Sequence, residues 1–209
     1  MQSVEHLVQQ RIIAEDSKES LKLRLKFEEY QNDFNFPDTI LEQESFLDVG
    51  AGNGEFISYL HKEKDNRNTY ALDTECPSSL PFCIEGSIEN LPYTDHLFDN
   101  IVARNVIHAI MLQDNNGEKT VRALQELVRV TKHGGKIYYS THTPSTLFQK
   151  IQGLDELTKD QKETSTQHLQ QGIQAEQKYL QYLASLGHSV QELFKNGRKV
   201  VTITLRAVQ

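Results

Sequence analysis

The stretch Phe46-Leu47-Asp48-Val49-Gly50-Ala51-Gly52-Asn53-Gly54-Glu55-Phe56 decides how this chain folds. An apolar run ends in three glycines at alternate positions, and an amphipathic segment follows at once. This order is typical of a strand, a tight turn and a helix. Glycines allow positive φ and leave bare backbone beside a ligand, and the helix directs its unpaired N–H groups and positive dipole end at the same place. The stretch therefore predicts a site for a ligand that carries an anionic group.

The spacing of these glycines separates two classes of cofactor. A dinucleotide fingerprint, G-x-G-x-x-G, needs its third glycine at the position of Glu55. The pattern present, apolar-apolar-Asp-apolar-G-x-G-x-G, instead resembles motif I of the class I S-adenosylmethionine-dependent methyltransferases. A nicotinamide-dependent oxidoreductase is the competing enzyme class. The plain structural alternative is a glycine turn that only tightens a strand–helix junction.

Three later segments extend the resemblance. A short apolar strand ends in Asp73, nineteen positions beyond the last glycine, where α/β nucleotide sites place an acid that binds the ribose hydroxyls. Residues 81–93 are similar to the family's Gly-Asp-Ala-Glu-x-Leu-Pro-Phe loop, but Ser87 replaces the acid that usually receives the adenine amino group. Residues 126–135 resemble the family's Glu-x-x-Arg-x-Leu-Lys-Pro-Gly-Gly join, with His133 in place of proline. As a group these motifs are specific.

The resemblance implies S-adenosylmethionine as the cofactor and S-adenosylhomocysteine as the product. Motif I would hold the methionine portion, with its aspartate holding the loop or the amino group. The end of the second strand would bind the ribose, and the loop after the third strand would flank the adenine. The end of the fourth strand would form the floor of the site, where the arginine either reaches the methionine carboxylate or stays solvated. The residues implied are Asp48, Gly50, Ala51 and Gly52 for the methionine portion, Asp73 and Thr74 for the ribose, Ser87 and Ile88 for the adenine, and Ala103 and Arg104 for the floor.

The sequence assigns no catalytic residue, although two histidines are candidates. His142 follows the polar end of the fifth strand, and an imidazole that titrates near neutral pH suits a general base. His108 matches a histidine common in the family's segment after the fourth strand. An ordinary loop position for His142 and a helix-packing role for His108 are the structural alternatives.

The succession of elements predicts an α/β fold. Five strands alternating with helices indicate a Rossmann-like, doubly wound parallel sheet, and the Asn196-Gly197 turn predicts a C-terminal hairpin that brings the sheet to seven strands. All 209 residues are expected to form one methyltransferase-like domain. It would comprise an N-terminal helical cap of one or two helices at 1–36, an α/β core at 40–207 and, within the core, an irregular polar lid at 144–172.

Composition narrows the partners and the setting. The formal net charge of −7 does not favour nucleic acid or anionic lipid as a partner of the whole molecule. Cys76 and Cys83 suggest neither a disulfide framework nor a zinc site, and no acidic trio for magnesium is visible, so no metal is expected. Without a recognisable leader or a run of eighteen apolar residues, we expect a cytoplasmic protein that does not span a membrane.

These observations predict a methyltransferase that moves a methyl group to a small-molecule acceptor by in-line displacement. The Asn-Pro-Pro-Tyr motif of enzymes that methylate base or amide nitrogens is missing after the fourth strand, where Ala103-Arg104-Asn105-Val106 stands. A protein or tRNA acceptor is the alternative within the enzyme class. A non-catalytic, cofactor-binding module of the same fold is the alternative outside it. The protein is expected to be a monomer or a homodimer.

Overall fold

A computed structural model of the chain describes residues 4–207, and side chains from Asp16 onward. The expected alternation of helices and strands holds only in part: helices separate β1 from β2 and β4 from β5, whereas β2, β3 and β4 follow one another without a helix. The helices are α1 (Val4–Phe34), α2 (Asp38–Gln43), α3 (Glu55–Glu63), α4 (Ile107–Met111), α5 (Glu118–Val130), α6 (Pro144–Gln152) and α7 (Lys159–Ser185). The strands are β1 (Phe46–Val49), β2 (Thr69–Asp73), β3 (Cys83–Glu85), β4 (Phe98–Arg104), β5 (Thr131–His142), β6 (Ser189–Lys195) and β7 (Arg198–Thr204).

One seven-stranded sheet organises these elements, in the order β3-β2-β1-β4-β5-β7-β6. The first five strands in this order are parallel neighbours, whereas β7 pairs antiparallel with both β5 and β6. Asn196 and Gly197 join β6 to β7 with φ values of 51° and 70°, the backbone that an Asn-Gly hairpin turn requires. The predicted fold class, a doubly wound and mostly parallel sheet with an antiparallel C-terminal hairpin, is confirmed.

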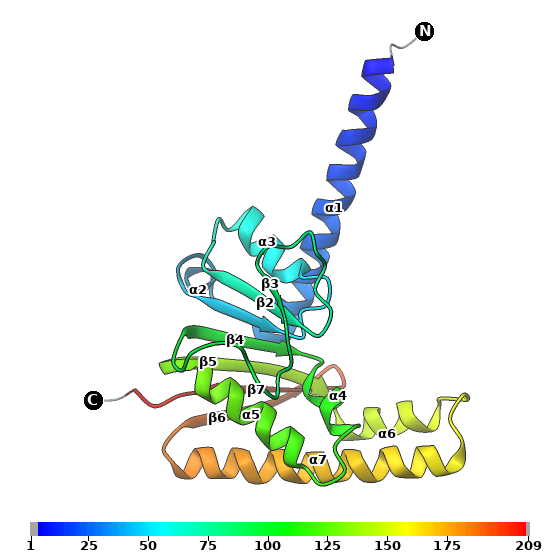
Figure 1. Cartoon of the computed structure of the whole chain (residues 1–209), viewed down its shortest axis with the longest axis vertical. Helices are drawn as coiled ribbons and strands as arrows, with labels where there is room; N and C mark the ends of the chain where they lie inside the picture. The colour runs from blue at the N-terminus through cyan, green and yellow to red at the C-terminus, as the bar shows by residue number, and fades with distance from the viewer. Residues whose placement is uncertain (1–3, 208–209) are drawn as a thin grey trace.

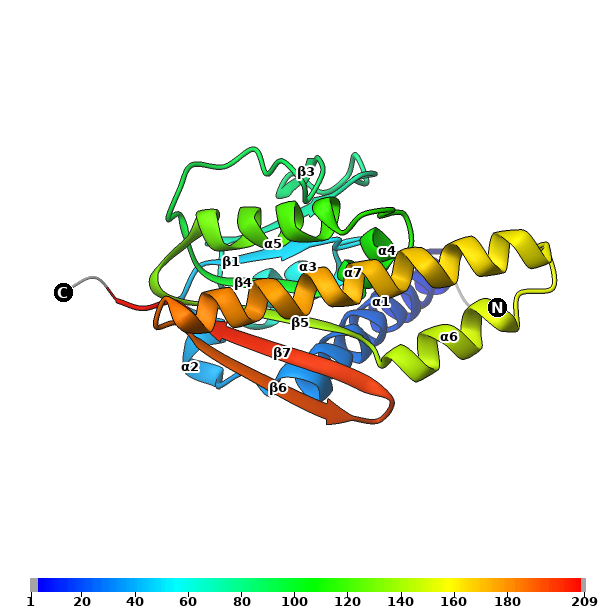
Figure 2. The same cartoon turned by 90° about the horizontal axis from the view of Figure 1, so that it is seen from below.

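Helices cover both faces of the sheet (Figures 1 and 2). An aromatic-rich core lies on the face of α1, α2 and α3, and a larger aliphatic core lies on the face of α4, α5, α6 and α7. The chain leaves β1 toward β2 and β3 on one side, then crosses to β4 on the other. This reversal leaves a crevice at the carboxyl ends of β1 and β4, where open α/β sheets bind ligands.

The N-terminal segment forms one long helix rather than a pair. α1 has 31 residues, and Figure 1 shows its first half projecting beyond the sheet. Residues 1–3 of the expected cap lie outside the described residues. The end of α1 docks through rings: Tyr30 stacks on Phe56 of α3 with centroids 4.2 Å apart, and Phe27 stacks on Tyr59 at 4.1 Å. Although α1 is long, no helix in the described part of the chain is apolar enough to cross a membrane.

The expectation of an irregular segment at 144–172 is wrong, because α6 and the first half of α7 occupy it. α7 starts at a capping box that the sequence contains, in which Thr158 and Gln161 exchange hydrogen bonds. Gly172 does not break α7; it allows close packing, since a Cβ there would stand 2.6 Å from Met111. Whether this helical pair acts as a cover for the site stays a prediction.

The expectation that Cys76 and Cys83 form no disulfide is wrong. They form a disulfide that closes the loop between β2 and β3, with an S–S distance of 2.01 Å. Seven positions separate them, so the pair has no CxxC spacing that would have identified it in the sequence. The loop that they close carries Leu80, which packs against Gly54 of the glycine turn.

A buried contact between Tyr30 and Asp48 attaches α1 to β1. The Tyr30 hydroxyl donates to Asp48, with oxygen distances of 2.9 and 3.2 Å, and the aspartate is fully buried. The pKa of Asp48 is raised to about 8, mainly by burial; the Tyr30 hydrogen bond opposes this shift, and the nearby Asp73 charge contributes to it. Burial also holds the pKa of Tyr30 well above its ordinary value. At neutral pH the contact is therefore between two uncharged groups.

Stability should depend on pH through Asp48. Its carboxyl ionises near 3.8 in the unfolded chain but near 8 in the folded one, so the folded state binds the additional proton between these values. The free energy of unfolding then falls as the pH rises, by at most about 1.4 kcal/mol per pH unit from this group. Asp48→Asn cannot titrate and keeps an oxygen that accepts from Tyr30. In urea unfolding, the free energy of unfolding of the variant should rise relative to that of the wild type between about pH 5 and about pH 8. A difference in unfolding free energy that does not change with pH would contradict the raised pKa.

Candidate functional site

A cleft of about 390 Å³ lies at the carboxyl ends of β1, β2 and β4, where the strand order reverses. Three parts of the chain form its wall. The glycine turn and the start of α3 contribute Gly50, Ala51, Gly52, Asn53 and Glu55. The neighbouring strand ends and α4 contribute Asp73, Arg104, Asn105, Val106 and Ala109, and α1 contributes Lys26 and Tyr30.

The glycine turn packs tightly on both sides and stays bare in the middle. All three glycines have positive φ, which favours glycine over other residues. A Cβ on Gly50 would stand 2.8 Å from Val106, and one on Gly54 would stand 2.7 Å from Leu80. A Cβ on Gly52 would meet no protein atom within 4 Å. The turn therefore leaves main chain open to the cleft at Gly52, as a ligand cradle requires.

Asp73 lies beside this turn because β2 pairs with β1 in parallel. Its Oδ2 accepts a hydrogen bond of 2.7 Å from the Gly52 N–H. Its Oδ1 accepts longer bonds, of 3.3 Å each, from the Thr74 hydroxyl and the Glu75 N–H. A carboxylate has about four acceptor positions, so Asp73 retains capacity for hydroxyl donors of a ligand. The structure thus brings together Gly50, Ala51, Gly52 and Asp73, as the sequence predicted.

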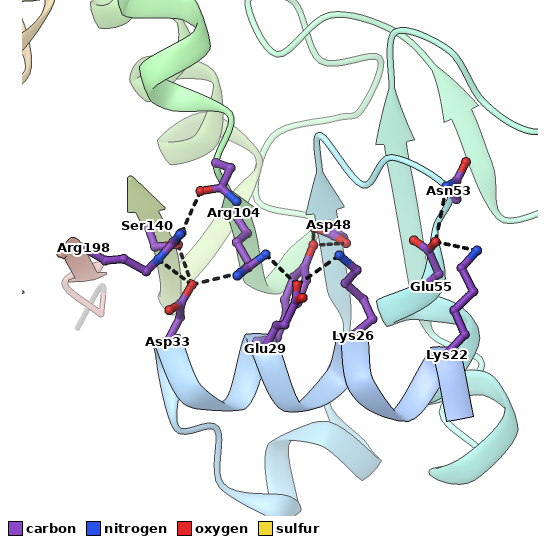
Figure 3. Close-up of polar contacts among 12 residues, drawn as sticks. Lys22, Lys26, Glu29, Asp33, Asp48, Asn53, Glu55, Arg104, Ser140 and Arg198 are labelled. Carbon is purple, nitrogen blue, oxygen red and sulfur yellow. Dashed lines mark hydrogen bonds and ion pairs between the residues drawn. The ribbon is translucent and has the colours of Figure 1, made fainter. Parts of the chain in front are cut away.

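Figure 3 shows the charged face of α1 directed at the strand ends. Lys22 pairs with Glu55 at 2.9 Å. Arg104 pairs with Glu29 and with Asp33, each at 2.9 Å. Arg104 lines the cleft as expected, and its guanidinium is held by two acids of α1, so the solvated alternative is wrong. Its contact with the methionine carboxylate stays a prediction. This face could have been recognised in the sequence, because residues 22, 26, 29 and 33 are three or four positions apart and therefore lie on one side of a helix.

Asp33 connects α1 to the far side of the cleft. Its carboxylate is buried, accepts from Ser140 at 3.0 Å, and lies between Arg104 and Arg198. The Arg198 Nε is 3.0 Å from Asp33 but is poorly aligned, so this contact is ionic rather than a good hydrogen bond. Arg198 also donates to Asn105 at 2.8 Å and to Ser140 at 2.6 Å. β4, β5 and β7 are thereby joined under the end of α1.

Several predicted residues do not line the cleft. Asp48 bonds Tyr30 inside the core rather than the glycine loop or a ligand group, because α1 covers it. Ala103 and Ile88 are buried in the aliphatic core. Ser87 is exposed, and its hydroxyl accepts from the Glu89 N–H. Thr74 is exposed beside Asp73, so its ribose role and the adenine roles of Ser87 and Ile88 stay predictions.

The two candidate histidines lie close to each other, outside the wall of the cleft. Their ring centroids are 5.5 Å apart, and Lys150 Nζ is 2.8 Å from His142 Nε2. Burial lowers the pKa of His108 to about 4, helped by nearby His142, Lys150 and Arg198. Burial and Lys150 also lower the pKa of His142. Both rings are neutral at pH 7, and a general-base role for either stays a prediction.

Comparison with known proteins finds a matching domain model and similar folds. Residues 47–139 match a family model described as a methyltransferase domain. A search of the curated proteins finds no match. An O-methyltransferase family protein from Burkholderia thailandensis superposes with a TM-score of 0.58 and 10% sequence identity. The superposition covers 93% of this chain and 60% of that protein, so this chain spans less than two thirds of it.

Two further solved structures match over nearly their whole length. A putative S-adenosylmethionine-dependent methyltransferase from Methanococcus maripaludis has a TM-score of 0.54 and 18% identity, with 95% of this chain and 93% of that chain covered. The plantazolicin methyltransferase BpumL, solved in complex with SAH, has a TM-score of 0.55 and 15% identity, with 96% and 100% covered. At these identities the three structures show the fold.

The region matched by the family model runs from β1 into β5. It contains the glycine turn, Asp73 and Arg104, which are the residues of the predicted set that meet at the cleft. The motif resemblance, the match over residues 47–139 and the shared fold agree: this part of the chain is similar to a methyltransferase domain, and its fold is that of S-adenosylmethionine-dependent methyltransferases.

Proposed function

We propose that this protein transfers a methyl group from S-adenosylmethionine to a small-molecule acceptor by in-line displacement. The observation that carries the proposal is the meeting of a bare glycine turn and an acidic strand end in one cleft. Gly52 leaves that turn open, and Asp73 stands next to it within hydrogen-bond distance. A nicotinamide dinucleotide is less well suited, because Glu55 occupies the position of its third glycine.

The residues of the cleft fit the two ends of the cofactor. The backbone of Gly50, Ala51 and Gly52 would hold the methionine portion, and Asp73 would accept from the ribose hydroxyls. Lys26 lines the cleft and forms its ion pair with Glu29 at 3.0 Å, which leaves it placed to meet a ligand carboxylate as well. When bound, the cofactor supplies a methyl group on positively charged sulfur, which an acceptor nucleophile displaces.

The protein's part in such a reaction is positioning and the exclusion of water. α1 supplies one wall of the cleft through Lys26 and Tyr30, and its ion pairs with Glu55 and Arg104 hold that wall in place. A base is needed only where the nucleophile starts protonated. His142 is the better placed of the two histidines for that task, since it lies at the end of β5 and is the less buried.

A small-molecule acceptor is supported by charge. α1 walls off one side of the cleft through Lys26 and Tyr30. The net charge of −7 gives no general attraction for the phosphates of tRNA. Transfer of isotope-labelled methyl groups to a metabolite extract tests the proposal. Label in small molecules supports it, whereas label in protein or tRNA fractions would establish the alternative acceptor. Binding without transfer to any fraction would indicate a non-catalytic module.

Asp73→Ala should weaken S-adenosylhomocysteine binding by about 1.5–3 kcal/mol, the usual value of hydrogen bonds to a charged group. Isothermal titration calorimetry measures the change. Glu75→Gln is the matched control, because it removes one negative charge from the same loop but no cleft residue. Its affinity should stay within about 0.5 kcal/mol of the wild type. Equal affinities for the Asp73 variant and the wild type would contradict the ribose assignment.

Gly52→Ala should weaken binding by about 1–3 kcal/mol, because its added methyl group enters the cleft. Gly134→Ala is the control for backbone strain: its φ of 79° is also positive, its Cβ would have only Ala207 near it, at 4.0 Å, and it lies outside the cleft. Both variants should lose similar stability in thermal unfolding, and only the first should lose affinity. Parallel losses of affinity in the two proteins would show that strain, and not the cradle, is responsible.

A further inference from the structure

A second hollow, here called the slot, lies between the end of β5, α6, α7 and the β6–β7 hairpin, elements that Figure 2 shows side by side. The apolar part of its wall is formed by Met111, Leu147 and Ile173. The interior volume is about 60 Å³, which is room for about four waters or a short branched alkyl group. No part of the cofactor cleft described above contributes to this wall, so the slot is a separate cavity.

One side of the slot is lined by charged residues, namely Glu176, Glu192 and Lys199. Glu176 and Lys199 are 1% and 5% exposed, and Lys199 Nζ is 3.0 Å from Glu176 Oε2. The hydroxyl of buried Tyr139 donates to Glu176 Oε1 at 2.5 Å. Lys199 is also 2.8 Å from Glu192 Oε2. Two carboxylates therefore share one ammonium, and the side has a net charge of −1.

One acceptor atom of this group is left over. Both oxygens of Glu176 and the Lys199 ammonium are engaged, but Glu192 Oε1 has no partner among the residues with described side chains. Glu192 lies on the slot wall and is partly exposed. An excess carboxylate beside apolar side chains favours a ligand that has both an ammonium and a hydrocarbon part. The same wall holds His142, which is neutral at pH 7 and whose Nε2 is 2.8 Å from the Lys150 ammonium.

We propose that the slot recognises the methyl acceptor by a primary ammonium group attached to a small branched apolar group. This assignment of acceptor class rests on the proposed methyltransferase function; the binding itself does not. β6 is the third neighbour of β4 in the sheet, which places Glu192 about 14 Å from the line of β4 at about 4.8 Å per strand. The ammonium is therefore an anchor and not the methylated atom. The proposal requires the rest of the acceptor to extend from the slot toward the cleft, starting at the wall that holds His142.

Met111 provides a direct reporter of binding. The chain contains only two methionines, and Met111 is buried against the slot. The ¹³C-methyl spectrum of the methionine-labelled full chain therefore has two signals, and Met111→Leu identifies the one that reports on the slot. Isobutylamine, isobutanol and isobutyrate are titrated in turn, with and without saturating S-adenosylhomocysteine. Isobutylamine is expected to shift the Met111 signal at lower concentration than the other two probes.

Glu192→Gln tests the anchor. This partly exposed residue loses its charge, while Lys199 keeps its pair with Glu176. Affinity for isobutylamine should fall about tenfold, and affinity for isobutanol should not change. Glu163→Gln is the matched control, since Glu163 is an exposed glutamate of α7 that does not line the slot. The affinity of this variant for both probes should equal that of the wild type.

The acceptor class is tested with the same variants. In labelled methyl transfer to a metabolite extract, cation-exchange resin should retain the labelled product, and Glu192→Gln should lose most of that label while Glu163→Gln keeps it. A Met111 shift for all three probes alike, or for isobutyrate alone, would overturn the ammonium assignment. If the cofactor product binds but no probe shifts Met111, the slot has only a packing role and the proposed function stands. Failure of the cofactor product itself to bind would reject the proposed function instead.

Discussion

The hydrogen bond between Tyr30 and Asp48 is the contact on which the site depends. A carboxyl group at the centre of a parallel sheet is costly to bury, by about 1–3 kcal/mol or more where a polar group is left unpaired. Here the cost is reduced in two ways, since Asp48 keeps its proton at neutral pH and Tyr30 covers both of its oxygens. The aspartate stands two positions before Gly50, so the helix that satisfies it is fixed beside the glycine turn.

That attachment makes α1 part of the cleft and not only its neighbour. Once Tyr30 is placed, helical spacing brings Lys26 to the cleft wall and directs Glu29 and Asp33 at Arg104. Arg104 also lies 5.6 Å from the centre of the Tyr30 ring, so the cation and the aromatic ring support the same arrangement. Asp33 extends the connection to Arg198 and Ser140. The ends of β4, β5 and β7 are therefore held by one helix turn, which gives the cleft a fixed shape before a ligand enters.

The sequence predicted what is local and missed what is distant. The glycine turn, Asp73 and the Asn196-Gly197 hairpin could be read because each depends on a few adjacent residues and on strand pairing. The Tyr30 contact joins residues 18 positions apart, and Arg104 meets Glu29 across 75. Neither spacing leaves a pattern in the sequence. α7 is a different case: its capping box was present, but its polar composition concealed a helix that buries only a narrow stripe of residues.

The uncharged histidines lie at the slot, where His142 is part of the wall and the centroid of the His108 ring is 5.5 Å from that of His142. An imidazolium near the cleft would repel the positive sulfur of a bound methyl donor, and it would also repel a cation held at the slot. Burial and the cations Lys150 and Arg198 keep the pKa of His108 near 4, so the ring is neutral throughout the physiological range. Lys150 adds a second constraint, because its contact with Nε2 requires His142 to be the acceptor there. Both rings are therefore uncharged, so the positive charges beside them are those of Lys150 and Arg198.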